Sequence, residues 1–433
     1  MKKLLLGSVL SAGIKIASAG LTFLMFLFLA RALGAEEYGK FGTMFSLGTF
    51  GGVLALCGQH TMSIKVLSSL EEKPGQGATR RRFVLRSYAI IAVVTVLCVG
   101  GFFLTYFSAN RFGMGFSLPI IVGASAFILP FALSDLVANQ VRAFGAISAA
   151  LVPRDIVWRA CIILLCLAAL SWPGVMPDAL SAMVTISGIL MLIIFLQMGY
   201  FFSRNRRMFA GPRTAQTESP KQISIWMWIA SLALMGASLN IVVASPFLSN
   251  DQIGAYFAAH KTSQLLLLPV MAINVVAAPT FARFHSQGKN ANLQDVGRKL
   301  AIILAPPLFG GALFLVILAP NLLALFDPAY ASAAPALVVL AMSFLFFGLG
   351  GPTPQLMLMA GGERDYVKMT LVSDGIGLCL LPFLIPAFGI VGAAMGLLVS
   401  RILFTIMAVT WCRTNLRVDT SILSLLPRAA LQR

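Results

Sequence analysis

Charged side chains are scarce in this sequence of 433 residues. Asp, Glu, Lys and Arg together make up 11% of it, whereas 58% of its residues are hydrophobic. The core of a soluble domain of this length cannot hide that much apolar surface from water. The composition therefore argues against a water-soluble protein and predicts an all-α polytopic membrane protein.

Sequence signatures of catalysis are also missing. There is no Gly-x-x-x-x-Gly-Lys-Ser/Thr loop, dinucleotide fingerprint, His-Glu-x-x-His or Cys/His cluster, and the histidines are His60, His260 and His285. The six cysteines form no Cys-x-x-Cys and lie in or beside apolar segments, where we expect them to pack as small hydrophobic side chains. The sequence therefore predicts no enzyme, cofactor or metal site, and leaves coupling to protons or sodium ions open.

Twelve apolar segments are long enough to cross a bilayer. They are predicted at residues 9–32, 38–62, 84–107, 116–141, 155–172, 179–202, 223–247, 252–280, 300–326, 332–360, 367–388 and 389–412. The connections on one side, together with both chain ends, hold 25 of the 32 Lys and Arg residues, whereas those on the other side hold Arg111 alone. The positive-inside rule therefore predicts cytoplasmic N- and C-termini. Topology and contact with anionic phospholipid explain the net charge of +17 without nucleic acid.

The two halves of the chain carry similar patterns. Ser224, Ser231 and Ser238 follow Ser8, Lys15 and Thr22 at an offset of 216 residues, about half the chain. We therefore expect two parallel six-helix repeats, residues 1–210 and 211–433, which form two lobes around a central cavity. The connections between the predicted helices are too short to fold as soluble domains.

One face of the first predicted helix is polar. Ser8, Ser11, Lys15, Ser18 and Thr22 are spaced three and four residues apart, so they share a helix face. Residues 1–19 also resemble a signal peptide, with Lys2-Lys3, a leucine run and a small-residue site at 17–19. Lys15 interrupts the apolar stretch before that site, which favours an uncleaved membrane span.

Charges inside the predicted spans divide into two sets. Asp135 and Arg159 lie at similar depth in neighbouring spans, as do Asp374 and Arg401, so we expect two structural ion pairs. Lys15 and Lys261 have no carboxylate in the same or the adjacent span. An ionised group at mid-bilayer costs roughly 3 kcal/mol, so these two lysines are candidates for binding an anionic ligand. Snorkelling or a packed polar contact is the alternative.

The first outer connection carries further charges. Arg31 and Lys40 lie near the outer interface, where an anchoring role is as plausible as a functional one. Glu36 and Glu37 start the second predicted helix, where the helix dipole favours carboxylates. Membrane glycosyltransferases place acidic residues in such a loop, but they also need large outer loops, which this chain lacks.

Four stretches resemble a known family. Residues 30–42 (Ala-Arg-Ala-Leu-Gly-Ala-Glu-Glu-Tyr-Gly-Lys-Phe-Gly) are similar to the first-loop signature of bacterial polysaccharide repeat-unit flippases of the Wzx type. That family belongs to the multidrug/oligosaccharidyl-lipid/polysaccharide exporter superfamily. Residues 326–330 (Phe-Asp-Pro-Ala-Tyr), 360–364 (Ala-Gly-Gly-Glu-Arg) and 385–394 (Ile-Pro-Ala-Phe-Gly-Ile-Val-Gly-Ala-Ala) fit the later turns of its pattern.

The resemblance implies a function in the bacterial cytoplasmic membrane. A V-shaped pair of lobes would carry undecaprenyl-pyrophosphate-linked oligosaccharide from the inner to the outer leaflet by alternating access, alongside a polysaccharide polymerase and a chain-length regulator. Lys15 and Lys261 would meet the pyrophosphate. The other residues that the resemblance places in the cavity are Arg31, Lys40, His260, Gln264, Ser11, Ser18, Thr22, Ser231 and Ser238.

The main alternative is a drug/cation antiporter of the same superfamily. Such an antiporter requires a titratable carboxylate in its cavity, and the first, second, seventh and eighth predicted helices contain no Asp or Glu within the membrane. The related lipid II flippases have fourteen helices, whereas twelve are predicted here. A glycosyltransferase that uses Glu36 and Glu37 is a third, weaker alternative.

The charge distribution makes the topology testable. Reporter proteins fused at Arg207 and Lys289 should be active as cytoplasmic reporters, and a fusion at Ala109 should report from outside the cytoplasm. If the reporters at 207 and 289 lay on opposite sides, both the twelve-helix count and the parallel repeat would be wrong.

Overall fold

The computed structural model describes residues 2–71, 77–110, 116–172, 174, 176–205, 225–233, 235–287 and 290–422. In that part of the chain every regular element is a helix, which confirms the predicted all-α class. Nine helical segments there are long and apolar enough to cross a membrane. They are 13–33, 35–70, 77–108, 118–143, 179–204, 292–317, 328–349, 363–388 and 390–416. The chain is therefore a multi-pass membrane protein.

Three of the twelve predicted spans fall outside these nine, and the helix of each is interrupted. The segment at 155–172 lies on a helix broken by a π-turn, the one at 223–247 is split into α9 (Ile225–Ala233) and α10 (Gly236–Ala244), and the one at 252–280 is split by a 3-10 turn. The count of twelve stays a prediction.

The chain packs as two compact units, Met1–Val242 and Val243–Arg433. The division falls within α10, and α9 packs on the first unit, where the Trp228 indole N–H donates to the Leu54 carbonyl over 3.1 Å. The expected boundary near residue 210 lies outside the described residues. The division into 1–210 and 211–433 stays a prediction.

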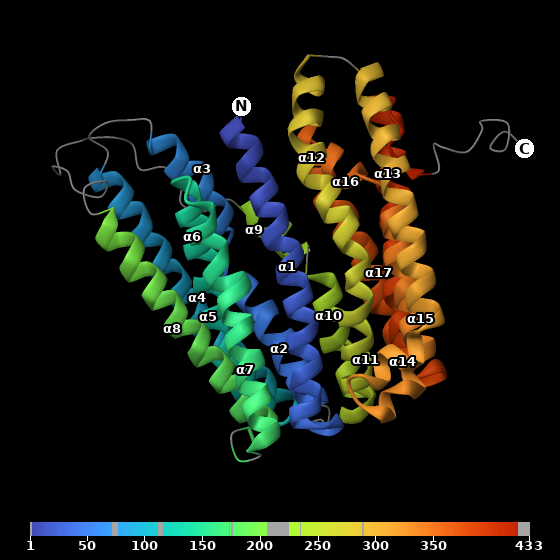
Figure 1. Cartoon of the computed structure of the whole chain (residues 1–433). Coiled ribbons are helices and arrows are strands. Elements are labelled where there is room, and N and C mark those ends of the chain that lie inside the picture. Colours follow the sequence, from blue (N-terminus) through green and yellow to red (C-terminus); the bar gives the residue numbers. More distant parts are fainter. Residues whose placement is uncertain are drawn as a thin grey trace, which may run out of the picture. The chain divides into compact units, whose positions relative to one another are not determined.

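The first unit is built around the packing of two helices. It contains α1 (Lys2–Leu33), α2 (Ala35–Leu56), α3 (Gln59–Glu71), α4 (Gly77–Asn110), α5 (Leu118–Ala143), α6 (Ile147–Val152), η1 (Pro153–Val157), α7 (Trp158–Ser171), α8 (Ala179–Arg204) and α9. Helix α2 packs along α5, and α1 lies beside α7 (Figure 1). A Cβ atom on Gly48 of α2 would lie 2.8 Å from the Ala124 carbonyl oxygen of α5. Glycine is therefore required for this close approach of two backbones.

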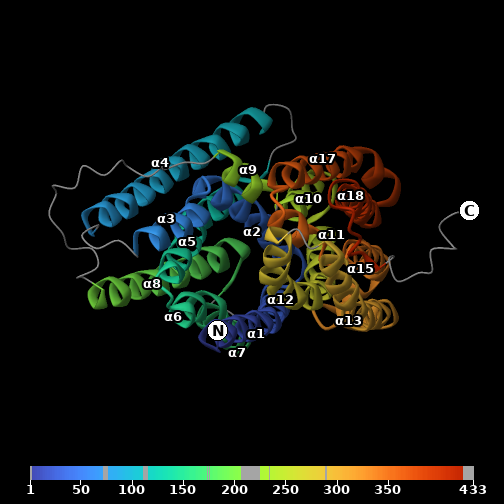
Figure 2. The ribbon, with the colours of Figure 1, turned by 90° about the horizontal axis from the view of Figure 1, so that it is seen from above.

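The second unit contains the remaining elements. They are η4 (Ser245–Phe247), α11 (Asn250–Ser263), η5 (Gln264–Leu266), α12 (Leu267–Ser286), α13 (Asn290–Ile317), α14 (Ala319–Ala324), η6 (Pro328–Ala333), α15 (Ala334–Leu349), α16 (Thr353–Met359), α17 (Glu363–Phe388), α18 (Ile390–Trp411) and η7 (Cys412–Leu416). Helices α17 and α18 pack side by side (Figure 2). Their glycines Gly377 and Gly396 face each other, and Gly389 joins them with a φ of +56°. Such a φ favours glycine, so the turn between the two helices takes one residue.

The connection expected at 142–154 is mostly helical. Only residues 144–146 separate α5 from a helix that runs through α6, η1 and α7. Pro153 begins the π-turn η1, and the backbone N–H of Trp158 donates to the Pro153 carbonyl, five residues earlier. This helix therefore begins eight residues before the expected span, and Arg154 and Asp155 belong to its body rather than to a loop.

We expect Gly48→Leu to destabilise the first unit, because the added side chain has to displace the backbone of α5. Overpacking of this kind costs about 1–3 kcal/mol. Thermal unfolding of the purified protein in detergent would measure the loss. Gly100→Leu on α4 is the matched control, since a Cβ there has no neighbour within 4 Å. Equal stability of the two variants would contradict the packing described here.

Candidate functional site

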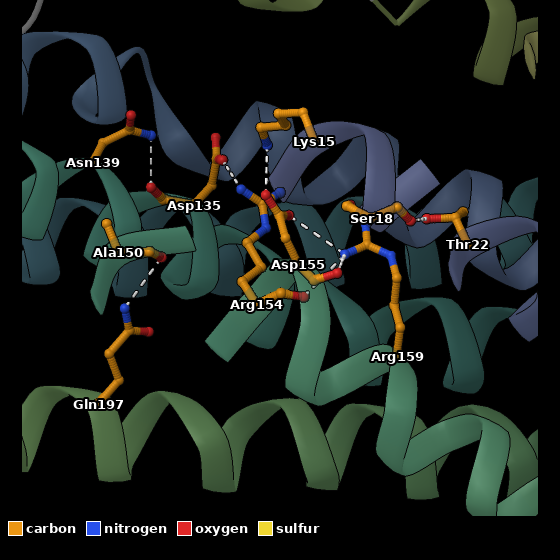
Figure 3. Close-up of polar contacts among 10 residues, drawn as sticks. All are labelled: Lys15, Ser18, Thr22, Asp135, Asn139, Ala150, Arg154, Asp155, Arg159 and Gln197. Carbon is orange, nitrogen blue, oxygen red and sulfur yellow. Dashed lines mark hydrogen bonds and ion pairs between the residues drawn. The ribbon is translucent and has the colours of Figure 1, made fainter. Parts of the chain in front are cut away.

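Lys15 forms an ion pair that the sequence did not predict. Its Nζ on α1 lies 2.6 Å from Oδ2 of Asp155 on η1 (Figure 3). The search for a carboxylate in the same and the adjacent span therefore missed the partner of Lys15. Asp155 comes from a helix 140 residues further along the chain, at the edge of a predicted span, so adjacency in sequence could not find it. The Lys15 side chain is 49% exposed, whereas that of Asp155 is 4% exposed.

Asp155 also has a second cationic partner. Nη1 of Arg159 lies 3.4 Å from Oδ1 of Asp155, and it donates to the carbonyls of Asp155 and Arg154 over 2.7 and 3.1 Å. The π-turn makes the Arg154 carbonyl available, since Trp158 donates to Pro153 instead. The guanidinium is thus fixed by the backbone as well as by the carboxylate.

Asp135 on α5 pairs with Arg154, through a hydrogen bond from Nη1 of Arg154 to Oδ1 of Asp135. The expected pair of Asp135 with Arg159 is therefore wrong, because Arg159 faces Asp155 instead. The guanidinium of Arg154 also lies 5.5 Å from the ring centroid of Phe131. The prediction paired Asp135 with Arg159 because they lie at similar depth in the membrane. The partner of each is instead set by the direction in which its side chain leaves the helix.

Lys15 and Arg159 share Asp155, whereas Arg154 pairs with Asp135. The guanidinium of Arg159 donates to the backbone carbonyl of Arg154, which connects the two groups into one cluster, hereafter the Lys15 cluster. It consists of Lys15, Arg154, Arg159, Asp135 and Asp155. Three cations and two carboxylates leave a net charge of +1. The side chain of Lys15 is the most exposed of the three cationic side chains of the cluster. An anion that approaches this cluster would therefore meet Lys15 first.

The rest of the polar face of α1 is less accessible. The Thr22 hydroxyl donates to the Ser18 carbonyl over 2.6 Å, and Ser18 is buried. The side chain of Ser11 lies outside the described residues. Among the described side chains of this predicted face, Lys15 is the one that both carries charge and is exposed.

The charged residues near the start of α2, where α1 ends, have structural partners. Nζ of Lys40 lies 2.9 Å from Glu36 and 2.7 Å from Glu37, and Oε2 of Glu37 accepts the backbone N–H of Ala179 over 2.8 Å. Asp178 caps the same helix start by accepting the N–H of Ser181, which holds the pKa of the Asp178 carboxyl below its usual range. Glu37 therefore stabilises the N-terminus of α8. Arg31 lies in the last turn of α1 and is exposed.

The site residues predicted in the second half are divided between the units. His260 and Lys261 lie in the last turn of α11, and Gln264 begins η5, in the second unit. Nζ of Lys261 lies 5.0 Å from the ring centroid of Phe257. Ser231 lies in the first unit, where its hydroxyl is 3.4 Å from Nε2 of His60.

The other two predicted residues of the second half, His260 and Ser238, are buried and partly buried. The imidazole of His260 is buried, with its centroid 6.1 Å from that of Phe344 and 6.4 Å from that of Tyr256. Ser238 lies on α10 and is partly buried.

The second predicted ion pair is present. Nη2 of Arg401 on α18 lies 3.8 Å from Oδ1 of Asp374 on α17, and the Ser400 hydroxyl donates to the same oxygen. Both charged side chains are at most 13% exposed, so they meet inside the second unit. Sequence reasoning missed Ser400, and it missed Arg154 and Asp155 in the first unit. Asp155 and Arg159 are four residues apart, and that spacing could have suggested their pairing on a helix.

The described residues contain no group of three or more His, Cys, Asp or Glu side chains that could hold a metal ion. A cavity of about 410 Å³ lies on another face of the π-turn, lined by α5, α6, Pro153 and α8. Its lining is almost entirely apolar and contains no predicted substrate residue. The chemistry of the first unit is therefore concentrated in the Lys15 cluster.

Solved structures with this fold are membrane transporters. The chain is similar to an inward-facing multidrug resistance MATE family transporter of the MOP superfamily, with a TM-score of 0.67, 14% identity and coverage of 93% of this chain and 94% of that one. The outward-facing structure has a TM-score of 0.63, with 12% identity and 95% of both chains covered. A MOP superfamily transporter from Pyrococcus furiosus has a TM-score of 0.65, at 12% identity and 95% of both chains. Identities this low show the fold alone.

A curated relative adds to this result. The chain is 28% identical over 190 residues to the protein named Probable flippase AglR of Haloferax volcanii, a match that covers 42% of this chain and 39% of that protein. The match therefore spans less than half of that relative. No protein-family model matches the sequence. The chain therefore has a fold similar to that of MOP superfamily transporters and resembles, over part of its length, a protein named as a probable flippase.

The new pairing of Asp135 can be tested. Asp135→Ala should destabilise the protein because it leaves Arg154 without its carboxylate. Breaking a buried pair costs about 3–5 kcal/mol, and less where the side chains are about one quarter exposed, as here. Asp135→Ala combined with Arg154→Ala should recover part of the thermal stability, measured in detergent. Equal recovery with Arg159→Ala would show that the partners are assigned wrongly.

Proposed function

We propose that this protein is a flippase for lipid-linked oligosaccharides with an anionic headgroup. The substrate is an oligosaccharide linked to undecaprenyl pyrophosphate, moved from the inner to the outer leaflet of the bacterial cytoplasmic membrane. A transporter fold and a partial match to a protein named as a probable flippase support this proposal. The observation that carries it is the Lys15 side chain, 49% exposed, in a cluster of net positive charge.

The chemistry of a pyrophosphate fits this cluster. Hydrocarbon cannot solvate its negative charges, and an ammonium can meet them with short charge-assisted hydrogen bonds. Two negative charges are also driven outward by an inside-negative potential, by about 4.6 kcal/mol per 100 mV. The proposal therefore needs no ATP, in agreement with the missing phosphate-binding loop.

The proposal assigns further residues to the same substrate. Lys261 would supply a second cation, and the hydroxyl and amide groups of the predicted cavity would contact the sugars. This part rests on twelve helices in two lobes, residues 1–210 and 211–433, with both termini cytoplasmic. A polysaccharide polymerase and a chain-length regulator would act on the product, and anionic phospholipid would surround the basic cytoplasmic ends.

A drug/cation antiporter of the same fold is the second candidate. The solved relatives include multidrug transporters, and the carboxylate of Asp155 lies against α1, which weakens the sequence argument that none is available there. Both carboxylates, Asp135 and Asp155, already have basic partners. A cluster whose cations outnumber its carboxylates repels a cationic drug, so we favour the flippase.

Charge variants of the two lysines distinguish these functions. With purified protein in vesicles that contain lipid-linked oligosaccharide, Lys15→Ala and Lys15→Glu should abolish transbilayer movement, and Lys15→Arg should retain part of it. Lys261 should follow the same order. Lys299→Ala is the matched control, because Lys299 forms an exposed helical pair with Asp295.

Immunoblots would verify equal protein levels, and export of a cationic drug would be measured on the same vesicles. Full oligosaccharide movement in Lys15→Glu would end the proposal of an anion site. Drug export that persists without oligosaccharide movement would establish the antiporter instead.

A further inference from the structure

We infer that Asp155 is a built-in competitor for the anionic headgroup, and that the phosphate replaces Asp155 as the partner of Lys15. This inference rests on the proposed function and names a residue that sets affinity rather than one that contacts the substrate. It makes Asp155 a positioning residue, which acts through Lys15. Three features of the cluster carry the argument.

The first feature is the unequal exposure of the pair. The Lys15 side chain is 49% exposed and can be approached by a ligand, whereas the Asp155 side chain is buried, with 4% of it exposed. An ammonium has three N–H donors, and Asp155 engages one of them over 2.6 Å. A phosphate can therefore reach Lys15 while Asp155 is still bound to it. The phosphate and Asp155 then compete for one positive charge.

The second feature is the second cation on Asp155. Arg159 is 3.4 Å from Oδ1, the oxygen that Lys15 does not use, and it is held in place by two backbone carbonyls. When Lys15 turns to a phosphate, Asp155 keeps this guanidinium. A buried carboxylate that loses every cation is strongly destabilised, but this one is not stranded. The exchange of partners is therefore energetically accessible.

The third feature is that Asp155 and its second partner, Arg159, lie on the same helix. Asp155 and Arg159 stand on the same helical segment across the π-turn, whereas Lys15 stands on α1 (Figure 3). The pair of Asp155 with Lys15 connects α1 to η1, and that connection opens when Lys15 changes partner. A transported ligand has to bind well enough to enter and weakly enough to leave. A competing carboxylate lowers the affinity and returns Lys15 to its resting partner after release.

The test is the binding of farnesyl pyrophosphate, a soluble polyprenyl pyrophosphate, to the purified full-length chain in nanodiscs. Asp155→Asn keeps the shape of the side chain and removes its charge, so it should lower the Kd by about 5- to 30-fold. The gain should disappear when Asp155→Asn is combined with Lys15→Gln. Asp295→Asn, in the exposed pair with Lys299, is the matched control and should leave the Kd unchanged.

A second variant should shift the affinity in the opposite direction. Arg159→Gln removes the other cation from Asp155, which then holds Lys15 more tightly, so the Kd should rise by a comparable factor. This effect should also require Lys15, and Asp155→Asn should reverse it. A merely structural role for the two residues predicts weaker binding in both variants.

The outcomes separate this inference from the proposed function. If the unaltered protein binds the probe through Lys15 but Asp155→Asn does not tighten binding, the competitor is ruled out and the flippase stands. If Asp155→Asn fails to fold, Arg159→Gln decides: a Kd that is unchanged or lower, or that rises equally when Lys15→Gln is already present, overturns the inference. If neither the unaltered protein nor any variant binds the probe, both proposals fall.

Discussion

Every charge that this chain places among its apolar helices has to be neutralised where it lies, because hydrocarbon supplies no water to solvate it. In the first unit this constraint centres on Asp155, which is buried between a lysine of α1 and an arginine one helical turn further along its own helix. The π-turn at Pro153 serves the same constraint. It leaves a carbonyl for Arg159 and lets Arg154 reach Asp135 on α5. The backbone irregularity and the charge network therefore depend on each other.

This arrangement leaves the excess positive charge where a ligand can use it. Arg154 and Arg159 are each about one quarter exposed or less, and both face carboxylates of the unit. Lys15 shares the same carboxylate as Arg159, yet half of its side chain is accessible. The same set of side chains thus neutralises its buried carboxylates and leaves a positive charge at the surface of the unit that can attract a ligand. The sign of the excess decides which ligands this fold can accept at that point.

The sequence was sufficient for the class of fold and for three of the five charged residues of the Lys15 cluster, but not for Arg154, for Asp155 or for the pairing. Composition and helical spacing predicted an all-α membrane protein and singled out Lys15, Asp135 and Arg159. Depth along a helix follows from residue number, whereas direction follows from an unbroken turn of about 100° per residue. Arg159 lies four residues after Asp155 on the same helix, and that spacing brings the two side chains together. Asp374 and Arg401 were paired correctly because one glycine joins two unbroken helices.

One fold can host different binding sites. The packing of α2 on α5 at Gly48 and Ala124 rests on glycine and apolar side chains and involves none of the charged residues of the Lys15 cluster. Charges elsewhere can therefore change while this contact remains in place. In this chain both carboxylates of the cluster are satisfied from within by arginines, so neither requires a cationic ligand. Under the proposed function, Lys15 is the group of the cluster that an anionic ligand would contact.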